Sequence, residues 1–169
     1  MPDAPGPATT TTPAIPETGG KVRPIVQHPD PRLRQVSRGL PDDPAALARD
    51  MLATMYAAPG RGLAAIQIGL PWRMFVIDPY WTDTGPSPLV ALDPELLEPS
   101  AETVTATESC LSIPGRPVDI TRPADVTLRW TGLDGLRRET RLEGIAAICA
   151  QHEYDHLEGV LILDHGPSA

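Results

Sequence analysis

Residues 143–159 read EGIAAICAQHEYDHLEG, an apolar run followed by two histidines and closed by Gly159. This pattern predicts a helix from about Glu143 to Glu158, because apolar residues recur along it and a glycine commonly follows a helix. On that helix His152 and His156 project from one face about one turn apart, so both rings can reach one metal ion. Glu153 can reach a metal-bound water from the side. The sequence therefore predicts a metal site on an otherwise apolar helix.

A third metal ligand is needed, because a catalytic divalent ion usually has three protein ligands and keeps one position for water. The extended peptidase motif HExxHxxGxxH would place a histidine at position 162, which is Ile162. Asp164 and His165 lie past the glycine that ends the helix, which places them awkwardly. His28 lies in a predicted turn, HPDP, and is expected to be exposed. The third ligand is therefore expected to come from upstream.

Two cysteines compete for this position. Cys149 shares the helix face of the histidines, but it precedes His156 by about two turns, or ~10 Å of helical rise. A metal ion ~2.1 Å from each histidine nitrogen hardly reaches that far, so Cys149 is expected to line the cavity or to be buried. Cys110 is favoured. It lies in ESCLSIPG, where a short extended segment meets a Pro-Gly turn that can lean against the helix, although spacing alone leaves the choice open.

The remaining segments predict an α+β domain in which a helix packs on a sheet. A second amphipathic helix is expected over Asp43–Ala58, ended by Pro59 and Gly60. A short β-prone stretch is expected at 22–27. Further strands are expected at 63–69, 72–78 and 89–97, and a hairpin at 124–142 turns at GLDG.

Composition limits the class of protein. The chain has 169 residues, a formal net charge of −8 and a pI near 4.9, which argues against a general surface for nucleic acid or anionic membranes. No apolar stretch is long enough to span a bilayer and no secretory signal is evident, so a cytoplasmic protein is expected. Residues 1–20, rich in Pro and Thr, are expected to form a disordered arm, and residues 21–169 a single catalytic domain.

Three ordered motifs resemble those of the peptide deformylase family. That family carries G-x-G-x-A-A-x-Q, E-G-C-x-S and H-E-x-D-H, and this chain has GRGLAAIQ at 60–67, ESCLS at 108–112 and HEYDH at 152–156. The segments VRPIVQHPDPRLR and HLEGVLILD are also similar to family segments. The resemblance extends over roughly Val22 to Asp164.

The resemblance implies a small α+β fold, with mixed or antiparallel sheets packed around a central HExxH helix. It also implies removal of the formyl group from the N-terminal formyl-methionine of nascent polypeptides. The motif match assigns the metal ligands Cys110, His152 and His156. It assigns Glu153 as the acid/base, and Gln67 and the Leu111 amide as the groups that polarise the formyl oxygen. The residues expected to bind substrate are Gly62, Arg61, Ser109, Ile145, Ile148 and Cys149.

The expected cofactor is one divalent metal ion. A thiolate with two imidazoles accommodates Zn²⁺, Fe²⁺, Co²⁺ or Ni²⁺, and the resemblance favours Fe²⁺ as the native ion. The expected partners are the formylated N-termini of nascent peptides. Proximity to the ribosome remains open, because no basic C-terminal docking helix is evident; no nucleic acid and no membrane are expected.

Two positions depart from the family pattern. Ser109 replaces the glycine before the metal cysteine, and it is acceptable there if its φ is not positive. Arg61 stands between the loop glycines, where the family often has an aliphatic residue. These departures keep two alternatives open: another HExxH peptidase or amidase, and a weakly active deformylase-like protein that binds metal or peptides.

Overall fold

The computed structural model describes residues 14–166. Seven strands and three α-helices are joined by short 3₁₀ helices. The strands are β1 Gly62–Ala64, β2 Met74–Ile77, β3 Leu89–Leu97, β4 Thr103–Cys110, β5 Ile113–Pro123, β6 Asp125–Thr131 and β7 Arg137–Glu143. The helices are α1 Pro44–Ala57, α2 Trp81–Thr84 and α3 Gly144–Leu157, with 3₁₀ turns η1 Pro31–Arg34, η2 Ala65–Ile68 and η3 Ile162–His165.

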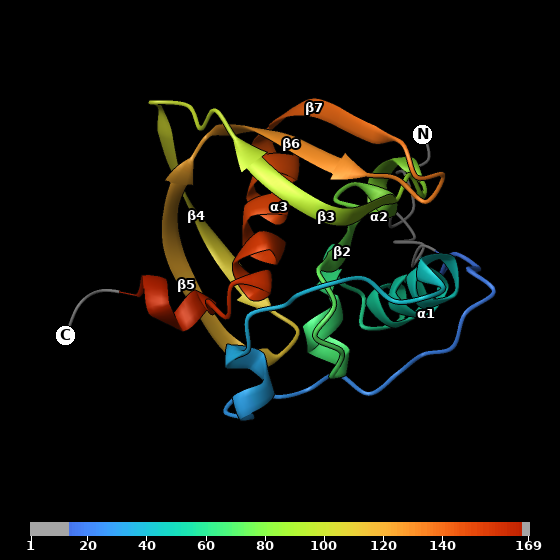
Figure 1. Ribbon diagram of the computed structural model, residues 1–169. Coiled ribbons are helices and arrows are strands. Elements are labelled where there is room, and N and C mark those ends of the chain that lie inside the picture. Colours follow the sequence, from blue (N-terminus) through green and yellow to red (C-terminus); the bar gives the residue numbers. More distant parts are fainter. Residues whose placement is uncertain (1–13, 167–169) are drawn as a thin grey trace, which may run out of the picture.

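The strands form two sheets, with α3 between them. An antiparallel sheet has the order β1-β2-β3-β6-β7, and β4 pairs with β5 in a separate two-stranded sheet. Figure 1 shows α3 between the long β4–β5 hairpin and the larger sheet. The central helix predicted over Glu143–Glu158 and the α+β fold are thus confirmed.

The short strand β2 explains how helices cover both faces of the larger sheet. Its four residues are all buried, because side chains alternate between two covered faces. Phe75 and Ile77 pack towards α3 with Ala150 and Leu157. Met74 and Val76 pack towards α1, where the core includes Met51, Met55 and Tyr56.

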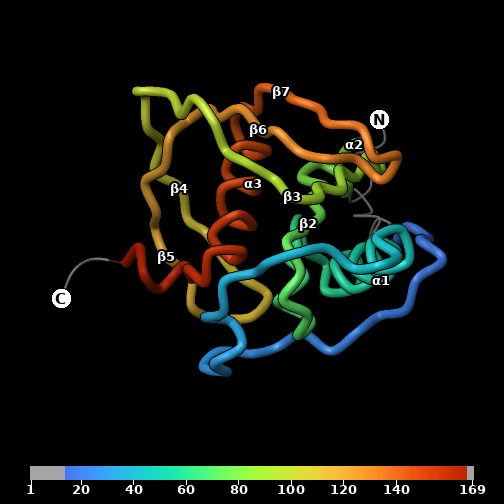
Figure 2. Tube along the Cα trace, viewed as in Figure 1, coloured from blue at the N-terminus to red at the C-terminus, as the bar shows by residue number. Residues whose placement is uncertain are grey.

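A third cluster joins the two-stranded sheet to the chain ends. Cys110, Ile113 and Ile120 of this sheet pack with Leu33 of η1 and Ile162 of η3. Figure 2 follows the chain through η1 to this end of the hairpin before it turns back towards α1. The end of α3 is fixed here too, because Gly159 has φ +73° and a Cβ on it would lie 2.5 Å from the Arg34 carbonyl oxygen. Cys110 therefore lies in a well-packed part of the molecule.

Several predicted elements agree with the structure. The predicted helix over Asp43–Ala58 is α1, whose N-cap Asp43 accepts a hydrogen bond from the Ala46 amide (3.1 Å) and is followed by Pro44. The predicted hairpin over 124–142 is β6 and β7. The strands expected at 72–78 and 89–97 are β2 and β3.

Two strand predictions were wrong, and one hairpin was not predicted. The stretch 63–69 is extended only to Ala64, after which η2 begins and Gly69 ends it with φ +83°. The stretch 22–27 joins no sheet; Val26 donates one hydrogen bond to the Gln67 carbonyl (2.7 Å). The β4–β5 hairpin was expected only as a short extended segment before a turn at Pro114-Gly115. Its turn is instead Leu111-Ser112, since Cys110 pairs with Ile113.

The predicted N-terminal arm falls mostly outside the described residues. Residues 1–13 lie outside them, whereas Thr18 donates a hydrogen bond to the Arg49 carbonyl of α1 (2.8 Å) and Lys21 donates one to Asp50 (2.8 Å). The division into an arm and a domain stays a prediction. Within residues 14–166, none of the helices has the length and apolar character needed to cross a membrane.

Candidate metal centre

The structure brings the three predicted metal ligands together. Cys110 ends β4, and His152 and His156 lie one turn apart on α3. One ligand atom from each lies within 4.8 Å of the other two, and Cys110 Sγ is 3.4 Å from His156 Nε2. Ligand atoms around a tetrahedral ion are about 3.5 Å apart, given bond lengths of about 2.0–2.3 Å. The arrangement therefore fits one divalent ion of the Cys/His/His type.

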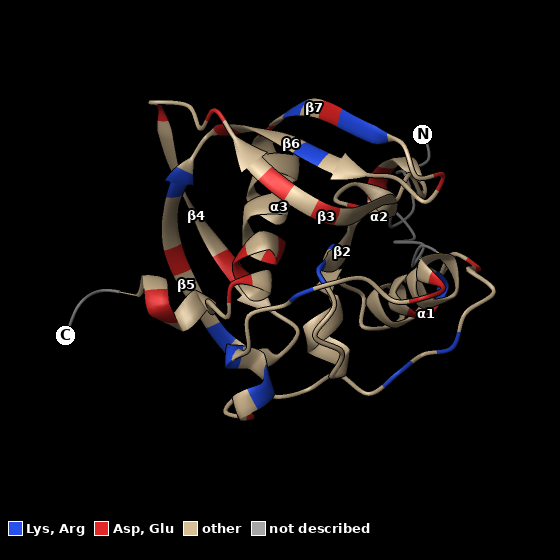
Figure 3. Ribbon diagram, in the orientation of Figure 1, with Lys and Arg blue, Asp and Glu red and all other residues tan. Residues whose placement is uncertain are grey.

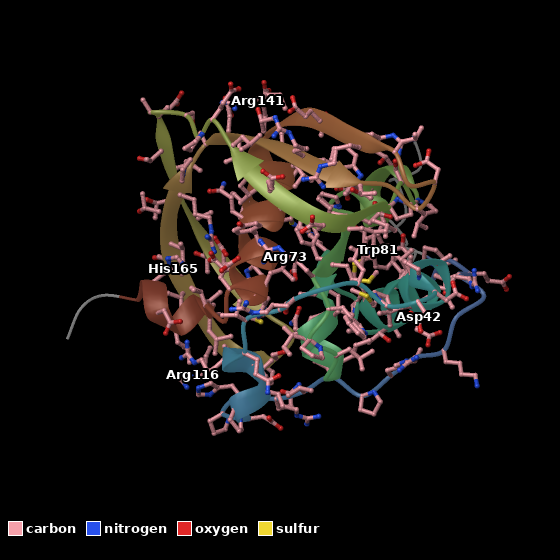
Figure 4. The ribbon with its side chains drawn as sticks, in the orientation of Figure 1. Asp42, Arg73, Trp81, Arg116, Arg141 and His165 are labelled. Atoms are coloured by element: carbon pink, nitrogen blue, oxygen red, sulfur yellow. The ribbon has the colours of Figure 1, made fainter. Side chains whose placement is uncertain are left out.

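A buried ion-pair network orients His152. Its Nδ1 lies 2.9 Å from Glu108 Oε1, so Nδ1–H donates to the carboxylate and Nε2 keeps its lone pair for a metal. Glu108 is in turn held by Arg122, at 2.6 and 2.9 Å. Arg122 also donates to Asp155 (2.9 Å), which His165 of η3, labelled in Figure 4, contacts from the other side. The network thus links the first ligand to β4, β5 and the C-terminal turn.

Burial and charged partners shift the pKa values of groups in and beside this network. Burial alone would raise the pKa of the Glu108 carboxyl, but hydrogen bonds from His152 and Arg122 outweigh it and lower the pKa to about 2. Burial lowers the pKa of His156 to about 3, with a further contribution from His152. His156 is therefore a neutral imidazole at physiological pH, which is the form that binds metals.

Glu153 faces the same centre and is held against the loop before η2. It is buried, and burial raises the pKa of its carboxyl to about 7. Oε1 lies 3.9 Å from His152 Nε2, while Oε2 has no hydrogen-bond partner among the described residues. A buried carboxylate oxygen without a partner beside three ligands fits a metal site that also holds water. A Cβ on Gly62 would lie 2.6 Å from Glu153 Oε1, so only glycine fits.

Gln67 reaches the centre because η2 turns it away from the path of a strand. Its Oε1 accepts a hydrogen bond from the Ala64 amide (2.9 Å), which leaves Nε2 facing Ser112 Oγ (3.1 Å) and Cys110 Sγ (3.7 Å). Leu111 follows Cys110 in the two-residue turn. The side-chain amide of Gln67 and the backbone of Leu111 are therefore both next to Cys110.

A cavity of about 690 Å³ opens beside the metal ligands. Its wall from α3 is apolar and comprises Ile145, Ile148 and Cys149. Burial, with a smaller effect of the Glu153 charge, raises the pKa of the Cys149 thiol to about 12, so it stays protonated and is a poor metal ligand. The opposite sides are formed by residues 106–111 of β4 and its turn and by residues 58–62.

All the residues expected to bind substrate line this cavity. Arg61 and Gly62 precede or begin β1, and Ser109 precedes the metal cysteine on β4. Ser109 is exposed and has no positive φ, so its backbone does not require the glycine of the family pattern. A Cβ on neighbouring Gly60 would lie 2.7 Å from Leu111 Cδ1, so the Leu111 side chain would have to shift. The roles of these residues stay predictions.

Two charged residues of the site were missed from the sequence. Glu108 was quoted within a motif but given no role, and Arg122 was not singled out. An acidic residue two positions before the metal cysteine, on the same side of a strand, was the available signal for Glu108. No sequence signal marks Arg122, because its partners Glu108 and Asp155 lie 14 and 33 residues away along the chain.

These features define a metal-dependent hydrolase with an HExxH helix, and comparisons with known proteins identify the family. The sequence profile of the polypeptide deformylase family matches residues 22–169. A peptide deformylase of Mesorhizobium japonicum is 50% identical over 147 residues, covering 85% of this chain and 84% of that protein. One of Rhizorhabdus wittichii is 45% identical over 152 residues, with 85% and 86% covered. The chain belongs to the peptide deformylase family, whose members are metal-dependent hydrolases.

Solved structures agree with this assignment. The peptide deformylase of Thermotoga maritima superposes with a TM-score of 0.77 at 37% identity, over 87% of this chain and 99% of that one. A peptide deformylase of Synechococcus elongatus in complex with actinonin gives a TM-score of 0.83 at 33% identity, over 92% and 88%. The fold predicted from the motifs is therefore confirmed.

Proposed function

We propose that this chain is an active peptide deformylase that hydrolyses the formyl amide of N-terminal formyl-methionine and releases formate. A buried carboxyl, Glu153, lies beside a Cys/His/His cluster at one end of a cavity whose neighbouring wall is apolar. That arrangement combines a hydrolytic centre with a pocket for an unbranched apolar side chain.

Each step of the reaction has a group of this chain in reach. Cys110, His152 and His156 would hold a divalent ion, which would lower the pKa of a water molecule and supply hydroxide near neutral pH. Glu153 accepts the proton of that water at Oε2, the oxygen without a partner. The hydroxide attacks the formyl carbon. Glu153 then gives the proton to the amine nitrogen as the carbon–nitrogen bond breaks, so that formate and a free amino terminus leave.

The oxyanion of the tetrahedral intermediate is stabilised by two donors. Gln67 is fixed by its bond to the Ala64 amide, so its Nε2 is oriented before substrate binds. The Leu111 backbone N–H follows Cys110 directly, in the turn between β4 and β5. Donors held in place in this way need no reorganisation as charge develops, which is the main source of their catalytic effect.

The cavity fits an extended peptide with methionine at its first position. In the part of the chain that the structure describes, β1 pairs only with β2, and β4 only with β5, so each keeps one edge open. Residues of both edges line the cavity. An extended peptide can add to such an edge through its backbone. A peptide deformylase of Acinetobacter baumannii, 29% identical with a TM-score of 0.78, has been solved bound to Met-Ala-Ser.

We further propose Fe²⁺ as the native ion. The Cys/His/His donor set also accepts Zn²⁺, Ni²⁺ and Co²⁺, and it is the resemblance to the family that favours iron. We place the enzyme in the cytoplasm, acting on the formylated N-termini of nascent peptides. Two cysteines outside any disulfide, Cys110 and Cys149, are compatible with a reducing compartment.

The function is tested with formyl-Met-Ala-Ser and protein loaded anaerobically with Fe²⁺, and again with Ni²⁺. We expect release of one formate per peptide with either metal, and a faster loss of activity in air for the Fe²⁺ form. A fully metal-loaded protein that releases no formate would refute the proposal. Cleavage within an unformylated peptide would identify a peptidase instead.

A further inference from the structure

The charged side chains that line the cavity differ in whether a group of opposite charge lies beside them. Besides the two cysteines, four of its lining residues have ionisable side chains: Arg61, Glu108, His152 and Glu153. Glu108 and His152 belong to the Arg122 network, and Glu153 is buried at the reaction centre. Arg61 is exposed, and among residues 14–166 no carboxylate lies within 4.0 Å of its guanidinium. It therefore carries the one uncompensated positive charge on the described lining.

The position of Arg61 is fixed by its backbone. Its carbonyl oxygen accepts a hydrogen bond from the Asp78 amide (2.9 Å), and the next residue, Gly62, pairs with Ile77 in the sheet. Gly62 itself packs against Glu153. Arg61 thus begins one residue from the reaction centre, and its charge opposes the effect of burial on the pKa of the Cys149 thiol. Arg61 also lines the same cavity as the apolar wall of α3.

The geometry of an extended peptide indicates which substrate residue meets Arg61. Side chains alternate along an extended chain, so the third residue lies on the same side as the first, about 7 Å further along. With methionine against Ile145, Ile148 and Cys149, the third side chain reaches the rim of that wall. Arg61 lines the same cavity, is exposed and carries a free charge.

We propose that Arg61 selects formylated peptides with an acidic residue, Asp or Glu, at the third position. The proposal rests on the deformylase function and deepens it. The guanidinium accepts a carboxylate side chain there through bidentate hydrogen bonds, a geometry that suits arginine better than lysine. The aliphatic part of Arg61 packs along the edge of the methionine wall.

The expected preference is modest. A partly solvated ion pair changes affinity by about threefold to fivefold. The formal net charge of −8 repels acidic peptides at long range, but this field is screened over about 8 Å at physiological ionic strength, so the contact with Arg61 dominates. The effect falls on KM rather than on kcat, because the contact is equal in the ground state and the transition state.

The test compares amidated peptides formyl-Met-Ala-Glu-Ser, formyl-Met-Ala-Gln-Ser and formyl-Met-Ala-Lys-Ser, since amidation removes the terminal carboxylate. For the natural protein we expect kcat/KM to be about fourfold higher with Glu than with Gln, and lowest with Lys. Arg61→Gln removes the ranking, Arg61→Lys keeps part of it, and Arg61→Glu reverses it. Arg141→Gln, a change on β7 outside the cavity lining, keeps it (Figure 4).

Binding of the deformylated peptides, measured by calorimetry on metal-loaded protein, separates the two proposals. Retained binding preference without formate release would refute the deformylase function and leave the assignment of Arg61 intact. Formate release with the same ranking in the natural protein and in Arg61→Gln would refute the assignment of Arg61 and leave the function intact. Equal binding of the Glu and Lys peptides would likewise refute the assignment of Arg61 and leave the function intact.

Discussion

The two halves of α3 differ in what surrounds them. The C-terminal half carries His152, Glu153 and His156. His152 is held by Glu108 of β4, which pairs with Arg122 of β5, and His156 lies against Cys110 of β4. The N-terminal half carries Ile145, Ile148 and Cys149 and faces the cavity with no polar network. One helix therefore contributes both to the candidate metal centre and to the apolar wall beside it.

This difference separates chemistry from selection. Changes around the C-terminal half are expected to affect the metal or the rate of the chemical step. Changes along the N-terminal half, and at Arg61 opposite it, are expected to affect which peptide binds. Figure 3 shows further charged residues on β3, β6 and β7, where pairs such as Arg129 with Glu139 are exposed. Exposed pairs of this kind stabilise a protein little.

The largest effect is expected from Cys110→Ala. Loss of the thiolate leaves two ligands, so the metal content should fall and activity should drop by on the order of 10³-fold or more, because no water is acidified. Metal analysis and formate release measure both. Cys149→Ala is the matched control, and it should keep the metal. If Cys110→Ala kept both its metal and its activity, the third ligand would be wrongly assigned.

A second large effect is expected from Gly62→Ala. The new Cβ would lie 2.6 Å from Glu153 Oε1, so the carboxyl must move. A displacement of about 1 Å can cost about 100-fold in rate, and the metal should stay. Gly166→Ala, whose Cβ would only contact the Leu163 carbonyl at 3.5 Å, serves as the control. Unchanged kcat in Gly62→Ala would show that Glu153 needs no fixed position.

Arg122→Gln tests the network behind His152. It leaves the buried Glu108 and the half-buried Asp155 without their arginine, so we expect the free energy of unfolding to fall by about 3–5 kcal/mol. Metal affinity should fall by about 10- to 100-fold because His152 loses its orientation. Urea unfolding and metal titration measure these changes, with the exposed Arg129→Gln as the comparison. Similar stability of the two variants would contradict a structural role for the buried network.

The smallest effect is expected from Ile148→Ala on the apolar wall. It removes contacts with the methionine side chain, so KM for formyl-Met-Ala-Ser should rise by about fivefold to tenfold, with kcat and metal content nearly unchanged. The same variant should discriminate less against formyl-Ala-Ala-Ser, because an alanine side chain makes few of the contacts that the substitution removes. A fall in kcat with constant KM would place Ile148 in the chemical step.

The parts of the fold that could be predicted have strong local signals. The two long helices and the β6–β7 hairpin follow from periodicity, Pro44 in the first helical turn and the GLDG turn. The β4–β5 hairpin could not be predicted in this way. Most side chains of β4 are exposed, and one of its two buried residues is the charged Glu108, so no apolar alternation marks the strand.

The candidate site was predictable where its residues share a helix or a motif. His152, Glu153 and His156 are recognisable from their spacing alone, and Cys110 from elimination together with the resemblance. The position of Gln67 was not predictable from periodicity, because its own side chain bonds the Ala64 amide and replaces a strand with a 3₁₀ turn. Arg122 depends on contacts that only the folded chain brings together.

In the proposed mechanism, Glu153 moves the proton at a metal ion held by Cys110, His152 and His156. Glu153→Gln keeps the size of the side chain and removes its ability to accept a proton. We expect this variant to hold as much metal as the natural protein and its rate of formate release to fall by about 10²- to 10⁴-fold. A fully loaded Glu153→Gln protein that releases formate at the natural rate would contradict it.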